Sequence, residues 1–264
     1  MTRNGIPALV FHAIVMAFIL APLVVICLVA FTPENTLTIP TTSFSLRWFT
    51  EIFRHDEFVQ SFWNSLLLAF LAATGSVGLA VPAGLALTRF RFPGRNFLNG
   101  LFLSPLIVPH LVLGVALLQL FSMIGATGSF VWLVGAHLVV VTPYSLRMVL
   151  AALAGSDPSI EHAAQSLGAS DFTVFWRVTL PLMLPGLTGG WLLSFINSFD
   201  ELTMSIFVTA PSTVTLPVRM YMYATESIDP MMASVSALVI ALTAVAMLLL
   251  DRIYGLDRIL VGQR

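Results

Sequence analysis

Residues 160–187 read IEHAAQSLGASDFTVFWRVTLPLMLPGL and separate two long apolar runs of the chain. Just before this segment, Asp157 can cap a helix whose first residue is Pro158, the arrangement that helix N-termini favour. Gly168 is placed to end that helix, because glycine readily takes the left-handed conformation of a helix C-terminus. One apolar stripe at helical spacing supports the helix: Ile160, Ala163, Ala164 and Leu167.

A second short helix is predicted directly after Gly168, with Ser170 as its cap. Its apolar residues repeat the helical spacing, and Pro181 and Pro185 are expected to stop it. They are Phe172, Phe175, Trp176 and Thr179. Two short helices joined at a glycine are too small to enclose a core. We therefore expect this loop, residues 157–181, to dock onto another protein.

The composition around the loop is that of a membrane protein. The chain is 58% hydrophobic and 9% charged, against about 25% charged residues in ordinary globular domains. Six apolar runs come close to the roughly 20 residues that cross the hydrocarbon core of a bilayer. They are residues 8–31, 61–87, 97–123, 130–150, 183–208 and 231–250. The sequence predicts an all-α integral membrane protein with six spans. The first run is too long for a signal-peptide core and is expected to stay in the protein.

The basic residues suggest an orientation and exclude some chemistry. All 12 are arginine, so the chain has neither the lysine of a phosphate-binding P-loop nor a Schiff-base lysine. Positive residues gather on the cytoplasmic side of membrane proteins, and this rule is best met with both termini in the cytoplasm. Nine arginines then lie inside: Arg3, Arg89, Arg91, Arg95, Arg147, Arg177, Arg252, Arg258 and Arg264.

Three prolines are expected to interrupt the spans. Pro105 and Pro109 should kink the third, and Pro143 should break the fourth near its end. The only cysteine, Cys27, allows no intrachain disulfide and suggests no metal cluster.

The stretch SFINSFDELTMSIF, residues 194–207, places two adjacent acids in the fifth apolar run. A continuous helix would put Asn197, Asp200, Glu201 and Met204 on one stripe, at i, i+3, i+4 and i+7. Charged side chains rarely face lipid, so this stripe is predicted to face a water-accessible cavity. Phe199 could add an aromatic edge to a cation site there.

Two interpretations of the acidic pair stay open. In the first, Asp200 and Glu201 bind a cationic amine as it crosses the membrane. In the second, one carboxylate pairs with an arginine of a partner subunit, or one stays protonated because two adjacent carboxylates resist joint ionisation.

The intramembrane histidines carry a weaker signal. His110 and His137 match no metal-ligand spacing, and hydrogen bonds between packed helices are the preferred role. No catalytic motif is present in the sequence, so we expect a protein that is not an enzyme.

The segment 160–187 resembles the EAA loop of type I ABC-importer permeases. Ala163, Ala164 and Gly168 match its first part in register, and Val178, Leu180 and Pro181 match its end. The family's glutamate falls on His162, with Glu161 just before it. The resemblance implies a coupling helix over Ala163–Phe172 that sits in a cleft of a cytoplasmic ATPase. The residues implied in coupling are Glu161, His162, Ala163, Ala164, Leu167, Gly168, Ala169, Ser170 and Phe172.

A narrower resemblance concerns the cargo. The stretch SFDELTMSIFVTAP, followed by TLPVRMYMY, is similar to the polyamine (spermidine/putrescine) permeases, whose relatives carry opines, amino-acid-like compounds or phosphonates. A proton-coupled secondary transporter that uses Asp200 and Glu201 is the alternative from another class.

The resemblance implies a multi-pass subunit of the bacterial cytoplasmic (inner) membrane that works by alternating access. Residues 1–60 would form an N-terminal helix and an interfacial helix, 61–250 the permease core and 251–264 a cytoplasmic tail. The implied partners are a dimer of ATP-binding cassette ATPases, a second homologous permease in a heterodimer, an extracytoplasmic binding protein and the bilayer, with no nucleic acid. The chain would hold no cofactor, because ATP and magnesium would bind the ATPase.

Overall fold

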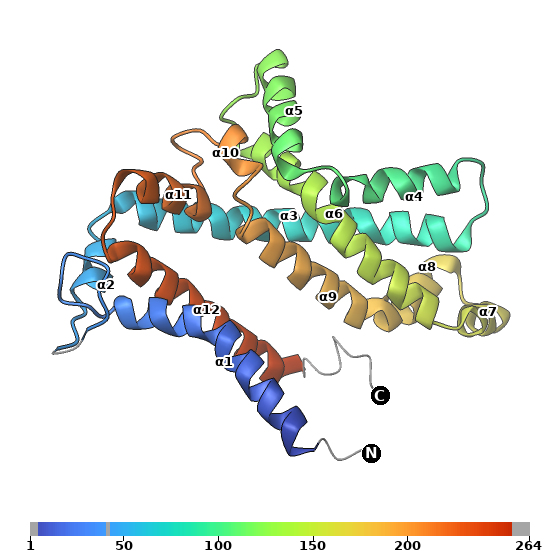
Figure 1. Ribbon diagram of the computed structural model, residues 1–264. Helices are drawn as coiled ribbons and strands as arrows, with labels where there is room; N and C mark the ends of the chain where they lie inside the picture. Colours follow the sequence, from blue (N-terminus) through green and yellow to red (C-terminus); the bar gives the residue numbers. More distant parts are fainter. Residues whose placement is uncertain (1–4, 41–42, 255–264) are drawn as a thin grey trace. The chain divides into compact units, whose positions relative to one another are not determined.

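The computed structural model describes residues 5–40 and 43–254, and the described residues are helical with no β-strand (Figure 1). The α-helices are α1 (Ile6–Val29), α2 (Arg47–Ile52), α3 (Asp56–Arg89), α4 (Arg95–Leu103), α5 (His110–Met123), α6 (Phe130–Gly155), α7 (Pro158–Ser166), α8 (Asp171–Val174), α9 (Leu180–Phe199), α10 (Ser205–Val208), α11 (Leu216–Glu226) and α12 (Met231–Tyr254). A 3₁₀ turn covers Ser104–Leu106, and a π-helical turn covers Phe175–Thr179.

The spans agree with the predicted all-α membrane fold, although their number matches only approximately. Four helical segments are long and apolar enough to cross a membrane, and a bent pair makes a possible fifth. The sixth predicted run falls on α12, whose described apolar part, Met231–Val245, is shorter. The bent pair joins Arg95–Leu106 to His110–Met123 at an angle of 103°. This bend confirms the kink expected from Pro105 and Pro109.

The chain divides into two compact units. The first combines the residues up to Gln60 with Arg219–Leu249, and the second contains Ser61–Val218. In the first unit, α1 and α12 pack through small residues, and the Ser234 hydroxyl donates a hydrogen bond to the Ala30 carbonyl at 3.0 Å. All the candidate site residues lie in the second unit.

In the second unit, α6 and α9 approach closely because α9 presents glycines to α6. A β-carbon added at Gly186 would lie 2.9 Å from the Met148 carbonyl oxygen. Where the backbones come this close, a buried hydroxyl cluster joins three helices: Ser76 of α3 donates to Ser145 of α6 at 2.7 Å, and Ser145 lies 2.8 Å from Ser194 of α9. Small residues and interhelical hydrogen bonds hold membrane helices together, since lipid supplies no hydrophobic drive between them.

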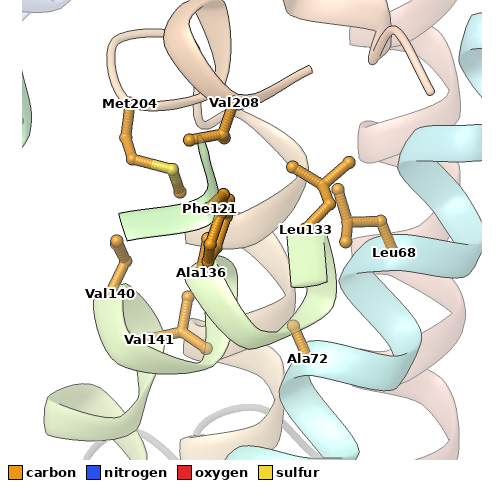
Figure 2. Close-up of a cluster of buried hydrophobic side chains, with 9 residues drawn as sticks. All are labelled: Leu68, Ala72, Phe121, Leu133, Ala136, Val140, Val141, Met204 and Val208. Carbon is orange, nitrogen blue, oxygen red and sulfur yellow. The ribbon is translucent and has the colours of Figure 1, made fainter. Parts of the chain in front are cut away.

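An apolar cluster lies toward the other end of α6 (Figure 2). It gathers side chains from α3, α5, α6 and the segment around α10. They are Leu68, Ala72, Phe121, Leu133, Ala136, Val140, Val141, Met204 and Val208. This cluster fixes the segment that follows α9 against α5 and α6.

Two predictions about prolines are wrong. Helix α6 runs unbroken through Pro143, and the helical chain that begins at α8 continues through Pro181 and Pro185 into α9. Membrane helices tolerate proline where neighbouring groups accommodate the freed backbone. The π turn Phe175–Thr179 lies just before Pro181. Hydrogen bonds in a π turn join residues five apart and not four. This change in the bonding pattern suits the approach to Pro181, which has no amide proton to donate. Both long helices therefore keep the length that a span needs.

Candidate functional site

The acidic pair lies at a break in the chain and not inside a helix. Helix α9 ends at Phe199, Asp200 is its C-cap, and α10 begins only at Ser205. The Glu201 Oε1 atom accepts a hydrogen bond from the backbone amide of Met204 at 2.7 Å. An acidic side chain that caps the next turn competes with helix continuation. The predicted continuous stripe from Asn197 to Met204 is therefore wrong beyond Phe199.

Glu201 is buried and bound on both carboxylate oxygens. Its side chain is 7% exposed, and Oε2 lies 2.7 Å from Nδ1 of His110, the first residue of α5. The sequence interpretation gave His110 a packing role but did not join it to Glu201, which is 91 residues away. The one local signal was that His110 follows Pro109, where the third span was expected to bend.

Asp200 has the opposite environment, since its side chain is exposed. Within residues 5–40 and 43–254, no side chain or backbone group hydrogen-bonds to its carboxylate. Beside it, the Phe199 ring stacks on Phe195 with 6.1 Å between centroids and meets the edge of Phe62 at 6.2 Å. Asn197 points back along α9, because its Nδ2 donates to the Leu193 carbonyl at 2.7 Å. Of the predicted pathway residues, Asp200 alone offers a free charge.

Met204 belongs to the apolar cluster and not to a polar face. It is fully buried among Phe121, Val140 and Val208 (Figure 2). The expected face is thus divided into an exposed Asp200, a paired Glu201 and a core Met204. The prediction that Met204 faces a cavity is wrong for this structure, because the chain turns after Asp200.

His137 confirms the packing role expected of it. The ring is fully buried in α6, with Nδ1 2.8 Å from the Ser198 hydroxyl and Nε2 3.0 Å from the Ser205 hydroxyl. It therefore joins α6 to the residues on both sides of the break at Asp200. No group of three or more histidine, cysteine or acidic side chains suited to a metal ion occurs among the described residues.

The loop after α6 follows the predicted local signals. The Asp157 carboxylate accepts from the Ser159 amide at 2.9 Å and caps α7, whose first residue is Pro158. This hydrogen bond holds the pKa of Asp157 below its usual value. Ser170 accepts from the Thr173 amide at 3.3 Å and caps α8. Gly168 has a φ of +90° and ends α7 through the left-handed conformation.

The implied coupling helix over Ala163–Phe172 is two helices. Helix α7 ends at Ser166, and α8 starts at Asp171. The left-handed Gly168 makes a continuous helix impossible here, and the turn is closed by Gln165, whose Nε2 donates to Asp171 Oδ1 at 2.9 Å.

The outer surface of this loop is strongly apolar. Leu167 is 90% exposed, Phe172 73% and Trp176 52%. Leu167 lies in the turn between α7 and α8, and Phe172 and Trp176 lie in the first turns of the long helical segment Asp171–Phe199. Ala163, Ser170 and His162 are exposed around them, whereas Ala164 and Ala169 are half-buried.

Glu161 anchors the loop to the end of α3. Its Oε1 lies 2.8 Å from Arg89 Nη2, and it accepts from the Thr179 hydroxyl at 3.2 Å. A groove of about 800 Å³ lies between the loop and the turn after α3. Its charged and polar lining includes Arg89, Arg91, Arg95, Glu161, His162, Gln165 and Asp171. The His162 Nδ1 atom lies 3.3 Å from Gln165 Oε1 within the loop.

Comparison with known proteins assigns this chain to a family. Residues 76–256 match the model of the binding-protein-dependent transport system inner membrane component. The spermidine/putrescine transport system permease protein PotC of Escherichia coli K12 is 29% identical over 235 residues, which cover 89% of each chain. The putrescine transport system permease protein PotI of the same strain is 31% identical over 232 residues, covering 84% of this chain and 82% of its own.

Among solved structures, a bacterial ABC transporter involved in the import of the acidic polysaccharide alginate has a similar chain. The TM-score is 0.74 at 16% identity, with 95% of this chain and 96% of the other covered. This likeness concerns the fold. The family match, which covers more than half of the residues, shows that the chain belongs to the binding-protein-dependent transport system inner membrane components.

Proposed function

We propose that this chain is one permease subunit of an ATP-driven importer for polyamines or related cationic amines. The likeness to PotC over 89% of the chain carries this proposal, because PotC is named for spermidine and putrescine transport. The exposed Asp200 beside Phe199 supports it chemically. A free carboxylate attracts an ammonium group, and aromatic rings add to cation binding.

The partner that supplies energy is an ATPase, which binds ATP and magnesium itself. As a member of its family, this chain is the membrane component and not the catalytic one. The apolar residues Leu167, Phe172 and Trp176 form a surface suited to a cleft in that partner. Anchoring through Glu161 and Arg89 would pass the movement of the loop directly to α3.

The remaining assembly follows from the family. Transport in this family depends on a binding protein, which we place on the extracytoplasmic side. A second, homologous permease would complete the pathway as a heterodimer. Both termini would lie in the cytoplasm, because this orientation places nine of the arginines on the cytoplasmic side. ATP-driven closure of the ATPase dimer would pull on the loop and open the pathway outward, so that the binding protein delivers its cargo.

The test is uptake of labelled putrescine and spermidine by bacteria that lack other polyamine importers and carry the complete transport system. Omission of this chain alone should reduce uptake to background, whereas omission of an unrelated permease should not. Thermal shift of the cognate binding protein with amines, opines, amino acids and phosphonates gives an independent readout of the cargo. A binding protein stabilised only by a non-amine would contradict the polyamine assignment. The assignment as a subunit of an ATP-driven importer would still hold.

A further inference from the structure

The contact between His110 and Glu201 pairs a buried carboxylate with a histidine, which helix packing alone does not require. Glu201 is the one buried acid among the residues whose side chains are described. One carboxylate oxygen caps the turn at Met204, and the other, Oε2, depends on His110 at 2.7 Å. A buried carboxylate in a membrane protein is costly unless it is paired. His110 is therefore the group that satisfies the outer oxygen of Glu201.

His110 is also the more accessible residue of the pair. Its side chain is 32% exposed, whereas that of Glu201 is 7% exposed. A solute group that is to reach Oε2 must therefore take the place of the imidazole. The group best able to do so is a cationic hydrogen-bond donor, because it brings both a hydrogen bond and a counter-charge to the buried carboxylate.

The position of His110 suits such an exchange. It is the first residue of α5 and follows Ile107–Pro109, where the chain bends by 103°. One turn further, Gly114 packs against the backbone of Met204, since an added β-carbon would lie 3.0 Å from the Met204 Cα. This close contact holds α5 beside the break after α9 independently of the histidine. The imidazole can then swing away by side-chain rotation while the two backbones stay together.

We propose that Glu201 exchanges its His110 partner for an ammonium group of the cargo during transport. His110 is then the hydrogen-bond partner that the cation replaces, and it is a specificity-determining residue of the pathway. The inference rests on the proposed function, since it takes the cargo to be an amine. Asp200 attracts the amine from its exposed position, and the neighbouring Glu201 receives it when the imidazole leaves. One donor replaces another, so the carboxylate is paired throughout.

The experiment uses the complete transporter in liposomes, with the loaded binding protein outside, and measures both putrescine import and ATP hydrolysis. In His110→Lys, a tethered ammonium stays on Glu201 and competes with the cargo. Import should fall at least tenfold while ATP hydrolysis stays within twofold. In His110→Gln, a neutral donor holds Glu201 but is displaced more easily than a tethered ammonium, so import should fall by less than in His110→Lys. His12→Gln, an exposed histidine of α1, is the matched control and should import normally.

Glu201→Gln is the complementary variant, because its amide keeps the shape and an acceptor for the Met204 amide but removes the charge. Import should fall at least tenfold with the assembled complex intact. A purely structural contact predicts the opposite for His110→Lys, because lysine keeps a hydrogen-bond donor on Glu201. Import by His110→Lys as fast as by His110→Gln, or wild-type import by Glu201→Gln, would overturn the exchange. A wild-type complex that imports no amine would overturn the proposed function itself.

Discussion

At the scale of single residues, two adjacent acids have different roles because the backbone turns between them. Asp200 closes α9 with an exposed carboxylate, whereas Glu201 turns inward to His110 and to the Met204 amide. Their sequence neighbourhood is shared, but their electrostatic environments are not. Substitutions at the two positions should therefore differ in effect, although the chemistry of the side chains is nearly the same.

The first prediction concerns Asp200. Asp200→Asn removes the free charge without removing an internal contact, so folding and assembly should be unchanged. Attraction between unit charges near a protein surface is of the order of a few kcal/mol. Loss of about 1.4 kcal/mol would lower amine import roughly tenfold. The measurement is initial putrescine uptake at limiting loaded binding protein, with ATP hydrolysis recorded in the same sample.

Glu226→Gln is the control, since it removes an exposed acid from α11. Normal uptake in both variants would exclude Asp200 from the pathway. A loss of ATP hydrolysis together with uptake in Asp200→Asn would indicate an assembly defect and not a missing cation contact.

At the scale of helices, local signals were reliable where the sequence alone determines the conformation. Asp157, Ser170 and Gly168 make hydrogen bonds to residues two or three positions away, and each has its predicted place. The prolines misled because their effect depends on the surroundings. Pro143 lies in a helix held by its neighbours. The break at Asp200 was missed for the same reason, since the inward turn is fixed by His110 and by the cluster around Met204.

The second prediction concerns the packing of α6 against α9. Gly186→Leu should destabilise the chain, because even a β-carbon at this position meets the Met148 carbonyl at 2.9 Å. Overpacking of this kind costs about 1–3 kcal/mol and sometimes more. Gly78→Leu on α3 is the matched control, since nothing lies within 4 Å of its β-carbon position.

Thermal unfolding of the purified chain in detergent measures the difference between the two glycines. Gly186→Leu should unfold at a clearly lower temperature than wild type, and Gly78→Leu close to it. Equal stability of the two variants would mean that α9 does not approach α6 as closely as the structure indicates. The hydroxyl cluster of Ser76, Ser145 and Ser194 depends on the same approach.

At the scale of the whole molecule, the candidate sites fall in one unit and are joined by continuous helices. The loop that carries Leu167 and Phe172 leads through the π turn into α9, which ends at Phe199 with Asp200 as its C-cap. The sequence could indicate both ends of this path. The side-chain pairs that hold its two ends were not visible in the sequence. Arg89 and Glu161 are 72 residues apart, and His110 and Glu201 are 91 apart. Such pairings arise from tertiary structure and leave no periodic pattern.

The third prediction tests whether the loop joins this path to an energy source. Leu167 is 90% exposed and makes up part of the apolar surface of the loop, so Leu167→Glu should leave the fold of the chain intact. A charge placed in an apolar interface without a partner is unfavourable by several kcal/mol. Copurification of the ATPase should then fall at least tenfold, and amine import should stop. Asn35→Glu, at an exposed position in the segment after α1, is the control for added charge. If Leu167→Glu retains the ATPase and imports normally, the apolar surface of the loop is not the docking site, and movement must enter the membrane helices elsewhere.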